Sequence, residues 1–431
     1  MTYGALAKHI LSTNDWATLH YTDQAYANFY QHPPLAIWMM ALTMKIFGTG
    51  DWVLRLLPAV VSGIGIVGVY LWGKKIRGEW FAFTTAFILL TSTRYLKYSK
   101  GFMLDPFLST FSIWSIYLTI LAIEKKSSRF ASAAGALLTA ALLSKGLFAF
   151  APLALSFFLF SRSTRLAAGY LLGVSVPLTL WFYFGHAQHY IARYYIEHVS
   201  ERVGHHTFSE HLAPMINLGK VYWPWLPFYI FGIYQLAKKY ASLPNLKSAS
   251  NPETVAGFAS LFFLGGFVLV ASFLEQYHTS FYPFAALVVA FALPEGREST
   301  QKKIVYGLYA VLVCVSTAML IQPTSFHGTE AQHPMRIALK SAREKCASPE
   351  VHRIAISTGV AEIWYALAMG TWNTDWDAFS TGPGASPGAA RSQLLLASVH
   401  DSLDSRWKGT GIKSGEFEIF QPIGKSYCRT N

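Results

Sequence analysis

The sequence contains little charge for its length. Of its 431 residues only 13% are Asp, Glu, Lys or Arg, whereas 52% are hydrophobic and 16% aromatic. A soluble domain usually has about 25% charged residues, so cytosolic enzymes, disordered chains and nucleic-acid binders are disfavoured. The formal charge of +12 has to be interpreted by position, because membrane proteins place Lys and Arg mainly on one side of the bilayer.

The sequence also lacks the short motifs of several protein classes. Three cysteines in 431 residues exclude a disulfide scaffold, and they form no CxxC pair of the kind that binds metal. Neither a Gly-rich phosphate loop nor an HExxH motif is present. The apolar composition indicates a polytopic membrane protein. Because these motifs are absent, its function has to be inferred from a few residues in its loops.

Ten apolar segments come near the length of about 20 residues that a membrane-spanning helix needs. They are residues 53–72, 80–97, 106–123, 130–144, 147–160, 166–185, 221–237, 255–273, 280–293 and 304–322. Basic residues gather in alternate connections, which the positive-inside rule assigns to the cytoplasm, at 74–77, 125–129, 162–165, 238–239 and 297–303. The other connections then lie outside, at 98–104, 145–146, 186–220 and 275–279.

By the same alternation, the first 32 residues and the last hundred or so are also expected on the outer side. Residues 33–49 are apolar but short, so we expect a helix in the outer interface, where Trp38 and Lys45 suit the headgroup level. The last hundred residues contain apolar stretches typical of strands, at 353–357, 394–398 and 416–420. They also contain one helical pattern, at 361–369. The predicted fold is an all-α polytopic membrane domain over 1–322, with an outer loop and the interfacial helix in 1–52, and a small extracytoplasmic α/β domain over 323–431.

Two cysteines, Cys346 and Cys428, lie near the two ends of that C-terminal domain. Because an extracytoplasmic compartment is oxidising, we predict that they pair. Two free thiols are the alternative, since sequence alone does not reveal connectivity.

The candidates for chemistry are polar residues in the outer connections, because ionisable groups in a membrane domain are functional candidates by default. Cationic side chains that converge on one surface there suit a phosphate. Asp105 begins a span and is placed to orient or deprotonate an acceptor, but capping its helix is the commoner role of such a residue. The spacing of His205, His206 and His211 matches no strong metal motif, so we expect no metal site. The alternative to a functional role for these outer residues is a polar loop wetted at the interface.

Several short motifs recur in a characteristic order. They are Asn14–Asp15–Trp16, His32–Pro33–Pro34–Leu35, Arg55–Leu56, Leu104–Asp105–Pro106, Ser144–Lys145–Gly146, Glu197–His198 with Arg202, His211 and Pro214, Pro224–Trp225, and Tyr282–Pro283. Together they resemble the motifs of membrane glycosyltransferases of the C-type superfold, above all the lipid A aminoarabinose transferases and the protein O-mannosyltransferases. Each motif is weak alone; the shared order and predicted outer side make the resemblance specific over about residues 1–295.

The resemblance implies a definite reaction. Such enzymes transfer a sugar from an undecaprenyl- or dolichyl-phosphate donor in the inner membrane to a lipid, glycan or protein acceptor on the periplasmic face, with inversion. The lipid phosphate is the leaving group, and the lipid-linked sugar is a donor substrate; no bound cofactor is implied.

The resemblance also suggests roles for individual residues. By motif position, Lys145 and Arg202 hold the donor phosphate, with His32 standing where the family often has Lys. Asp105 matches the family's second acidic position and is the candidate catalytic residue. Since the ordinary pKa of His is about 6.5, His32 carries less charge at neutral pH than a Lys would. Candidates for contact with the sugar or the acceptor are Glu201, His211, Tyr277 and His278.

One feature of the family has no counterpart here. Its first outer loop follows a transmembrane helix and starts with an acidic residue, but the matching segment would precede Tyr3. We expect a start further upstream. The alternative is a weakened or inactive relative with a structural role.

A transporter or lipid flippase is the competing class of function. Such proteins need polar groups near the middle of the membrane and often contain internal repeats. Charges in the middle of the predicted spans are scarce, and no internal repeat is visible. The sequence therefore favours a glycosyltransferase.

Overall fold

The structure is a computed structural model with many helices and one small sheet. The chain divides into two compact units. The larger unit consists of Tyr30–Met39 and Gly50–Leu320, and the smaller of Met1–Phe29, Met40–Thr49 and Ile321–Asn431. The residues that the structure describes are 2–20, 29–146, 149–160, 163–200, 208–222, 225–241, 251–268, 275–292, 302–303, 306–307, 310–311, 334–346, 353–356, 377–380, 394–398, 403, 405 and 407–428.

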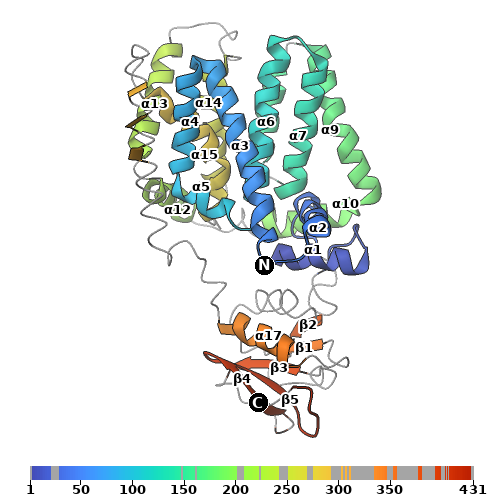
Figure 1. Cartoon of the computed structure of the whole chain (residues 1–431). Helices are drawn as coiled ribbons and strands as arrows, with labels where there is room; N and C mark the ends of the chain where they lie inside the picture. The colour runs from blue at the N-terminus through green and yellow to red at the C-terminus, as the bar shows by residue number, and fades with distance from the viewer. Residues whose placement is uncertain are drawn as a thin grey trace. The chain divides into compact units, whose positions relative to one another are not determined.

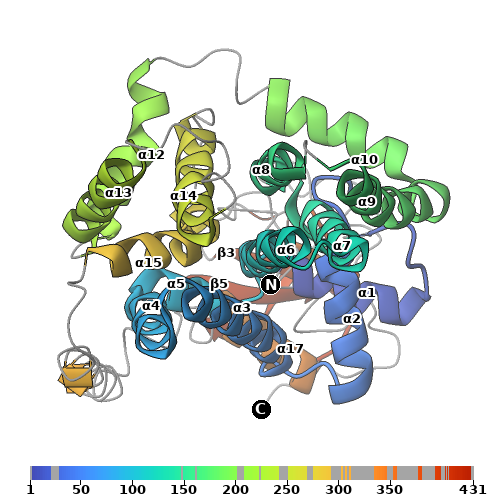
Figure 2. The same ribbon diagram turned by 90° about the horizontal axis from the view of Figure 1, so that it is seen from above.

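The larger unit is a bundle of helices (Figures 1 and 2). Its elements are α3 (Val53–Arg77), α4 (Glu79–Thr91), α5 (Thr93–Ser99), α6 (Asp105–Glu124), α7 (Ser128–Lys145), α8 (Phe150–Phe160), α9 (Thr164–Phe184), α10 (Ala187–Tyr194), the π-helical turn η2 (Tyr195–Ser200), α12 (Phe208–Val221), α13 (Leu226–Ala241), α14 (Pro252–Val268), the 3₁₀ helix η4 (Glu275–Ser280) and α15 (Tyr282–Phe291). Helix α2 (Leu35–Phe47) has residues in both units.

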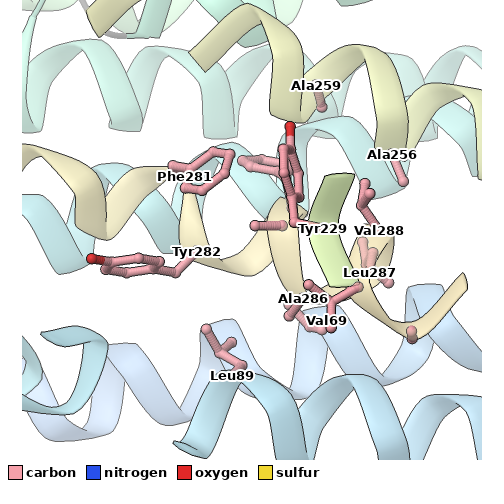
Figure 3. Packing of buried hydrophobic residues seen from close by; sticks show 14 of the residues in the cluster. Val69, Leu89, Tyr229, Ala256, Ala259, Phe281, Tyr282, Ala286, Leu287 and Val288 are labelled. Carbon is pink, nitrogen blue, oxygen red and sulfur yellow. The ribbon is translucent and has the colours of Figure 1, made fainter. Parts of the chain in front are cut away.

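Two apolar cores hold the bundle together. One contains residues of α3, α4, α13, α14 and α15, among them Val69, Leu89 and Tyr229, together with Phe281, which precedes α15 (Figure 3). The other lies among α6, α7, α8 and α9 and includes Tyr170. All residues of α15 are buried, as expected of a helix that is apolar on every side. This core fixes η4, which leads directly into α15.

Three helices in the described chain, α3, α6 and α9, are long and apolar enough to cross a membrane. Helices α2, α4 and α15 are apolar but shorter. The helix-rich fold agrees with the sequence analysis, whereas the membrane topology with ten spans stays a prediction. The last predicted span, 304–322, lies mostly outside the described residues.

The predicted span 80–97 is divided into α4 and α5. Ser92 adopts an extended conformation, with φ −73° and ψ 92°, and its hydroxyl donates to the Ile88 carbonyl at 2.9 Å. Ser and Thr hydroxyls that bond to the backbone compete with helical hydrogen bonds and weaken a helix; the neighbouring Thr91 hydroxyl also does so, donating to the Phe87 carbonyl at 2.9 Å. The break makes α5 a separate element that carries Arg94 and Tyr98.

Other boundaries also differ from the predictions. The segment 1–52, expected as a loop and one helix, contains α1 (Thr2–Thr13) as well as α2. The predicted loop 186–220 is helical through α10, η2 and α12, and the predicted span 221–237 begins only with α13. Short amphipathic helices such as α10, in which only Ala187 and Tyr190 are buried, fall below the length that a search for spans detects.

Glycines let α7 and α9 approach closely. The Ser132 hydroxyl donates to the Gly169 carbonyl at 2.8 Å. A Cβ atom on Gly173 would lie 1.9 Å from the Ser132 carbonyl oxygen, and one on Gly135 would lie 2.2 Å from that of Tyr170. Small residues in such positions are typical of helix pairs in membranes, where packing replaces the hydrophobic effect.

We therefore expect Gly173→Ala to lower the unfolding temperature of the protein in detergent, because the methyl group forces the two backbones apart. Gly265→Ala on α14 is the matched control. A Cβ there meets nothing within 4 Å, so this change should be neutral or stabilise the helix by about 0.5–1 kcal/mol. Equal effects of the two variants would contradict the close packing of α7 and α9.

The smaller unit contains helix α17 (Pro334–Lys345) and a five-stranded sheet in the order β2-β1-β3-β5-β4. The strands are β1 (Arg353–Ile356), β2 (Asp377–Ser380), β3 (Leu394–Ser398), β4 (Trp407–Ser414) and β5 (Phe417–Pro422). β1 pairs in parallel with β2 and β3, whereas β5 pairs antiparallel with β3 and β4. Helix α17 packs against β4 and β5.

The mixed sheet agrees with the predicted α/β character of the C-terminal region. Strands β1, β3 and β5 correspond to the predicted stretches, and the predicted helix 361–369 lies outside the described residues. β4 was not predicted, because Gly409 and Gly411 weaken its strand propensity. A disulfide joins Cys346, just after α17, to Cys428, after β5; this is the pairing expected from the sequence.

Candidate active site

Two antiparallel helices bring Asp105 and Lys145 to the same end of the bundle. Only residues 125–127 connect α6 to α7, and the two helices lie side by side (Figure 1). Asp105 is the first residue of α6 and Lys145 the last of α7. Gly146 ends α7 at this point with φ +74°, and its N–H donates to the Leu142 carbonyl at 2.7 Å. Since a positive φ favours glycine, the sequence Lys145–Gly146 fixes where the helix stops.

The two charged side chains form a buried ion pair. The Lys145 Nζ atom donates to Asp105 Oδ1, and the two residues are 5% and 3% exposed. Asp105 is in the first turn of α6, and the N-cap residue before it, Leu104, makes no side-chain capping hydrogen bond. Removing one member of a buried pair leaves an uncompensated charge, which is strongly unfavourable.

Aromatic residues from two other elements enclose Lys145. The ring of Tyr277, in η4, has its centroid 4.1 Å from Lys145 Nζ, a cation–π contact that gains strength in a desolvated site. The hydroxyl of Tyr194, in α10, donates to the Lys145 carbonyl at 3.0 Å. A Cβ atom on Gly146 would lie 2.6 Å from the Tyr194 ring. Asp105, Lys145 and Tyr277, three of the residues selected from the sequence, are thus in one contact group.

A second group, not predicted as part of the site, anchors the start of η4. Glu275 accepts from the Tyr98 hydroxyl at 2.6 Å and forms ion pairs with Arg94 Nε at 2.8 Å and Lys97 Nζ at 3.3 Å. Burial tends to raise the pKa of Glu275, but the Tyr98 hydrogen bond and the two cations outweigh it and hold that pKa below its usual range. The available signal was the presence of Arg94 and Lys97 within the last four positions of the predicted span 80–97.

His278 is fully buried. Its Nε2 atom is 3.2 Å from the Pro214 carbonyl oxygen, to which the ring N–H donates. Burial lowers the pKa of His278 to about 4. The ring is therefore neutral near pH 7, which suits a hydrogen-bonding role better than the binding of an anion.

The remaining predicted residues are not placed in this group. His32 is half-buried in the segment that leads into α2. Glu201 and Arg202 lie outside the described residues; His211 belongs to α12, and its side chain is outside them too. Within the described part of the chain, no three His, Cys, Asp or Glu residues form a group that would hold a metal ion.

A family model described as dolichyl-phosphate-mannose-protein mannosyltransferase matches residues 31–184. The matched segment contains His32, Asp105 and Lys145, that is, the motifs at 32–35, 55–56, 104–106 and 144–146. The family resemblance predicted from these motifs is confirmed. Tyr277 and His278 lie beyond the segment that matches the mannosyltransferase family.

A curated relative supports the same class. The undecaprenyl phosphate-alpha-4-amino-4-deoxy-L-arabinose arabinosyl transferase of Pseudomonas savastanoi pv. phaseolicola (strain 1448A / Race 6) is 25% identical over 121 residues. The alignment spans 28% of this chain and only about a fifth, 21%, of that relative. The relative and the mannosyltransferase family are both glycosyltransferases by description, which agrees with the predicted function and lends the transporter alternative no support.

Solved structures share the fold. ArnT from Cupriavidus metallidurans bound to undecaprenyl phosphate aligns with a TM-score of 0.71 at 14% identity, over 100% of this chain and 94% of that one. The oligosaccharyltransferase AglB from Archaeoglobus fulgidus, in complex with an inhibitory peptide and a dolichol-phosphate, aligns with a TM-score of 0.56 at 11% identity, over 92% and 65%. At these identities the likeness establishes the fold alone.

The ion pair leads to a prediction for stability. Lys145→Met or Asp105→Asn alone should destabilise the protein by about 3–5 kcal/mol, because each leaves the other charged group buried without its partner. The double variant should recover much of that loss, since it buries no charge. Unfolding temperatures of the four proteins in detergent test this, and a double variant less stable than both single ones would contradict the pairing.

Burial of His278 leads to a prediction for pH dependence. The unfolded chain binds a proton at this ring below about pH 6.5, whereas the folded protein does so only near pH 4. Stability should therefore fall as the pH drops from 6.5 to 4, by at most about 3 kcal/mol in total. His278→Gln should reduce the difference between unfolding temperatures measured at pH 7.5 and pH 5. An undiminished difference would exclude His278 as its cause.

Proposed function

We propose that this chain is an inverting glycosyltransferase that takes a sugar from a polyprenyl-phosphate donor. The acceptor is a lipid, glycan or protein on the extracytoplasmic face of the cytoplasmic membrane. The observation that carries the proposal is the buried Lys145–Asp105 pair, in contact with Tyr277, inside the segment that matches the mannosyltransferase family. The same face is proposed for the C-terminal α/β domain.

The proposed reaction requires a cation at the donor phosphate. The acceptor oxygen or nitrogen forms a bond to the anomeric carbon while the bond from that carbon to the phosphate oxygen breaks, and the electron pair leaves with the phosphate. The phosphate changes from a diester with one negative charge to a monoester with nearly two. A cation beside it therefore stabilises the transition state more than the ground state, as catalysis requires.

Lys145 and Asp105 supply complementary groups for this reaction. The Lys145 ammonium group has three donor protons, one of which goes to Asp105. When the donor binds, its phosphate competes with Asp105 for Lys145. The carboxylate that loses this contact then takes the proton from the acceptor. In this account Arg202 and His32 assist at the phosphate, and Glu201, His211, Tyr277 and His278 are near the sugar or the acceptor.

The test is transfer from undecaprenyl-phosphate-linked 4-amino-4-deoxy-L-arabinose, the donor named in the arabinosyl relative, to lipid A in proteoliposomes. The same assay is repeated with other undecaprenyl-phosphate-linked sugars and with other acceptors. Lys145→Ala should lower transfer at least about 100-fold, the cost of losing one strong transition-state contact. The matched control is Arg129→Ala, which removes an exposed cation from the other end of α7.

Binding separates the role of Lys145 from the choice of sugar. Native mass spectrometry with undecaprenyl phosphate should detect the lipid on the wild type and on Arg129→Ala but much less on Lys145→Ala. Near-normal transfer by the Lys145→Ala, Arg202→Ala double variant would overturn the phosphate role.

A further inference from the structure

Glu275 occupies an unusual position in the bundle. It is the first residue of η4, and three side chains of one short helix, α5, bind its carboxylate: Arg94, Lys97 and Tyr98. The three contacts cover both carboxylate oxygens, with Arg94 on Oε1 and the other two on Oε2. Charge-assisted hydrogen bonds of this kind are stronger than neutral ones and restrict geometry. The start of η4 is thus fixed to α5.

The rest of η4 is fixed to other elements. The Ser109 hydroxyl, on α6, donates to the Thr279 carbonyl at 3.2 Å, and His278 donates to the Pro214 carbonyl of α12 at 3.2 Å. Between these anchors is Tyr277, whose ring covers Lys145 Nζ at 4.1 Å. Tyr277 itself is only two residues from Glu275. A shift of Glu275 would therefore move the aromatic ring that covers the proposed phosphate-binding group.

We propose that Glu275 is a positioning residue of the transferase site: its contacts with Arg94 and Tyr98 hold the Tyr277 ring on Lys145 and so hold the ammonium group where the donor phosphate arrives. This inference rests on the proposed function for its catalytic consequence and on the contacts above for its geometry. In this inference Glu275 acts on Lys145 through Tyr277, and no direct contact with the substrate is invoked.

The two cations of α5 offer an internal comparison. Arg94 approaches Glu275 to 2.8 Å with its side chain 35% exposed, whereas Lys97 is 3.3 Å away and 54% exposed. Arg94→Gln and Lys97→Gln remove the same charge from the same helix near the same carboxylate. Arg94→Gln should lower kcat/KM about 10-fold, as expected for a hydrogen bond to a charged group. Lys97→Gln should lower it less than about 2-fold, as expected for a more exposed pair.

A double-mutant cycle separates positioning through Tyr277 from a general effect on the fold. Glu275→Gln should lower kcat/KM about 10-fold in the wild type. In the Tyr277→Leu background it should lower kcat/KM less than about 2-fold, because the ring that Glu275 positions is already gone. Equal losses in both backgrounds would overturn the proposal. Glu253→Gln is the matched control, since Glu253 is another acid bound by two cations, Arg77 and Lys239, at the start of α14.

A measurement that needs no activity keeps this inference distinct from the proposed function. The full chain in detergent is treated with an amine-reactive N-hydroxysuccinimide ester, and mass spectrometry of its peptides gives the acylation rate of Lys145. Glu275→Gln should raise that rate at least about 5-fold, because a loosened ring opens access to Lys145, a residue that is now 5% exposed. Glu253→Gln and Lys97→Gln should leave the rate unchanged.

The two failures are distinguishable. An unchanged acylation rate in Glu275→Gln would overturn the positioning role, whether or not the protein transfers a sugar. A raised rate in Glu275→Gln, together with a wild-type protein that transfers none of the sugars tested, would support the geometry and count against the proposed function.

Discussion

The buried contact between Lys145 and Asp105 is the interaction on which this end of the larger unit depends. An ion pair at 5% and 3% exposure is stable only when its geometry is good and its surroundings provide further polar contacts. The Tyr277 ring of η4 lies on Lys145 Nζ, and the Tyr194 hydroxyl of α10 donates to the Lys145 backbone carbonyl. The short α6–α7 connection and the stop at Gly146 set where Asp105 and Lys145 meet.

The same constraint explains why η4 is more than a connection between α14 and α15. It is bound to α5 at Glu275, to α12 at His278 and to α6 at Thr279, and it contacts Lys145 through Tyr277. Helix η4 leads into α15, whose residues are all buried. The ring beside Lys145 is thus positioned by contacts to several elements at once.

Much of this arrangement was predictable from the sequence, and the reasons differ by residue. Asp105, Lys145 and Tyr277 were selectable because charged or polar side chains at the ends of apolar segments are conspicuous. The partners Arg94, Tyr98 and Tyr194 were not, because the short helices α5 and α10 that position them were taken from the sequence as the end of a span and as parts of loops. Nor did the sequence reveal that Lys145 contacts Asp105: their separation of 40 residues becomes a contact only through the length and direction of two packed helices.

We propose that Lys145 exchanges its contact with Asp105 for one with the donor phosphate. The most direct test is an experimental structure of the full chain, in lipid nanodiscs, with undecaprenyl phosphate bound. We expect a phosphate oxygen within hydrogen-bonding distance of Lys145 Nζ and an Asp105 carboxylate that has separated from it. A bound phosphate elsewhere, with the Lys145–Asp105 pair intact, would contradict this proposal.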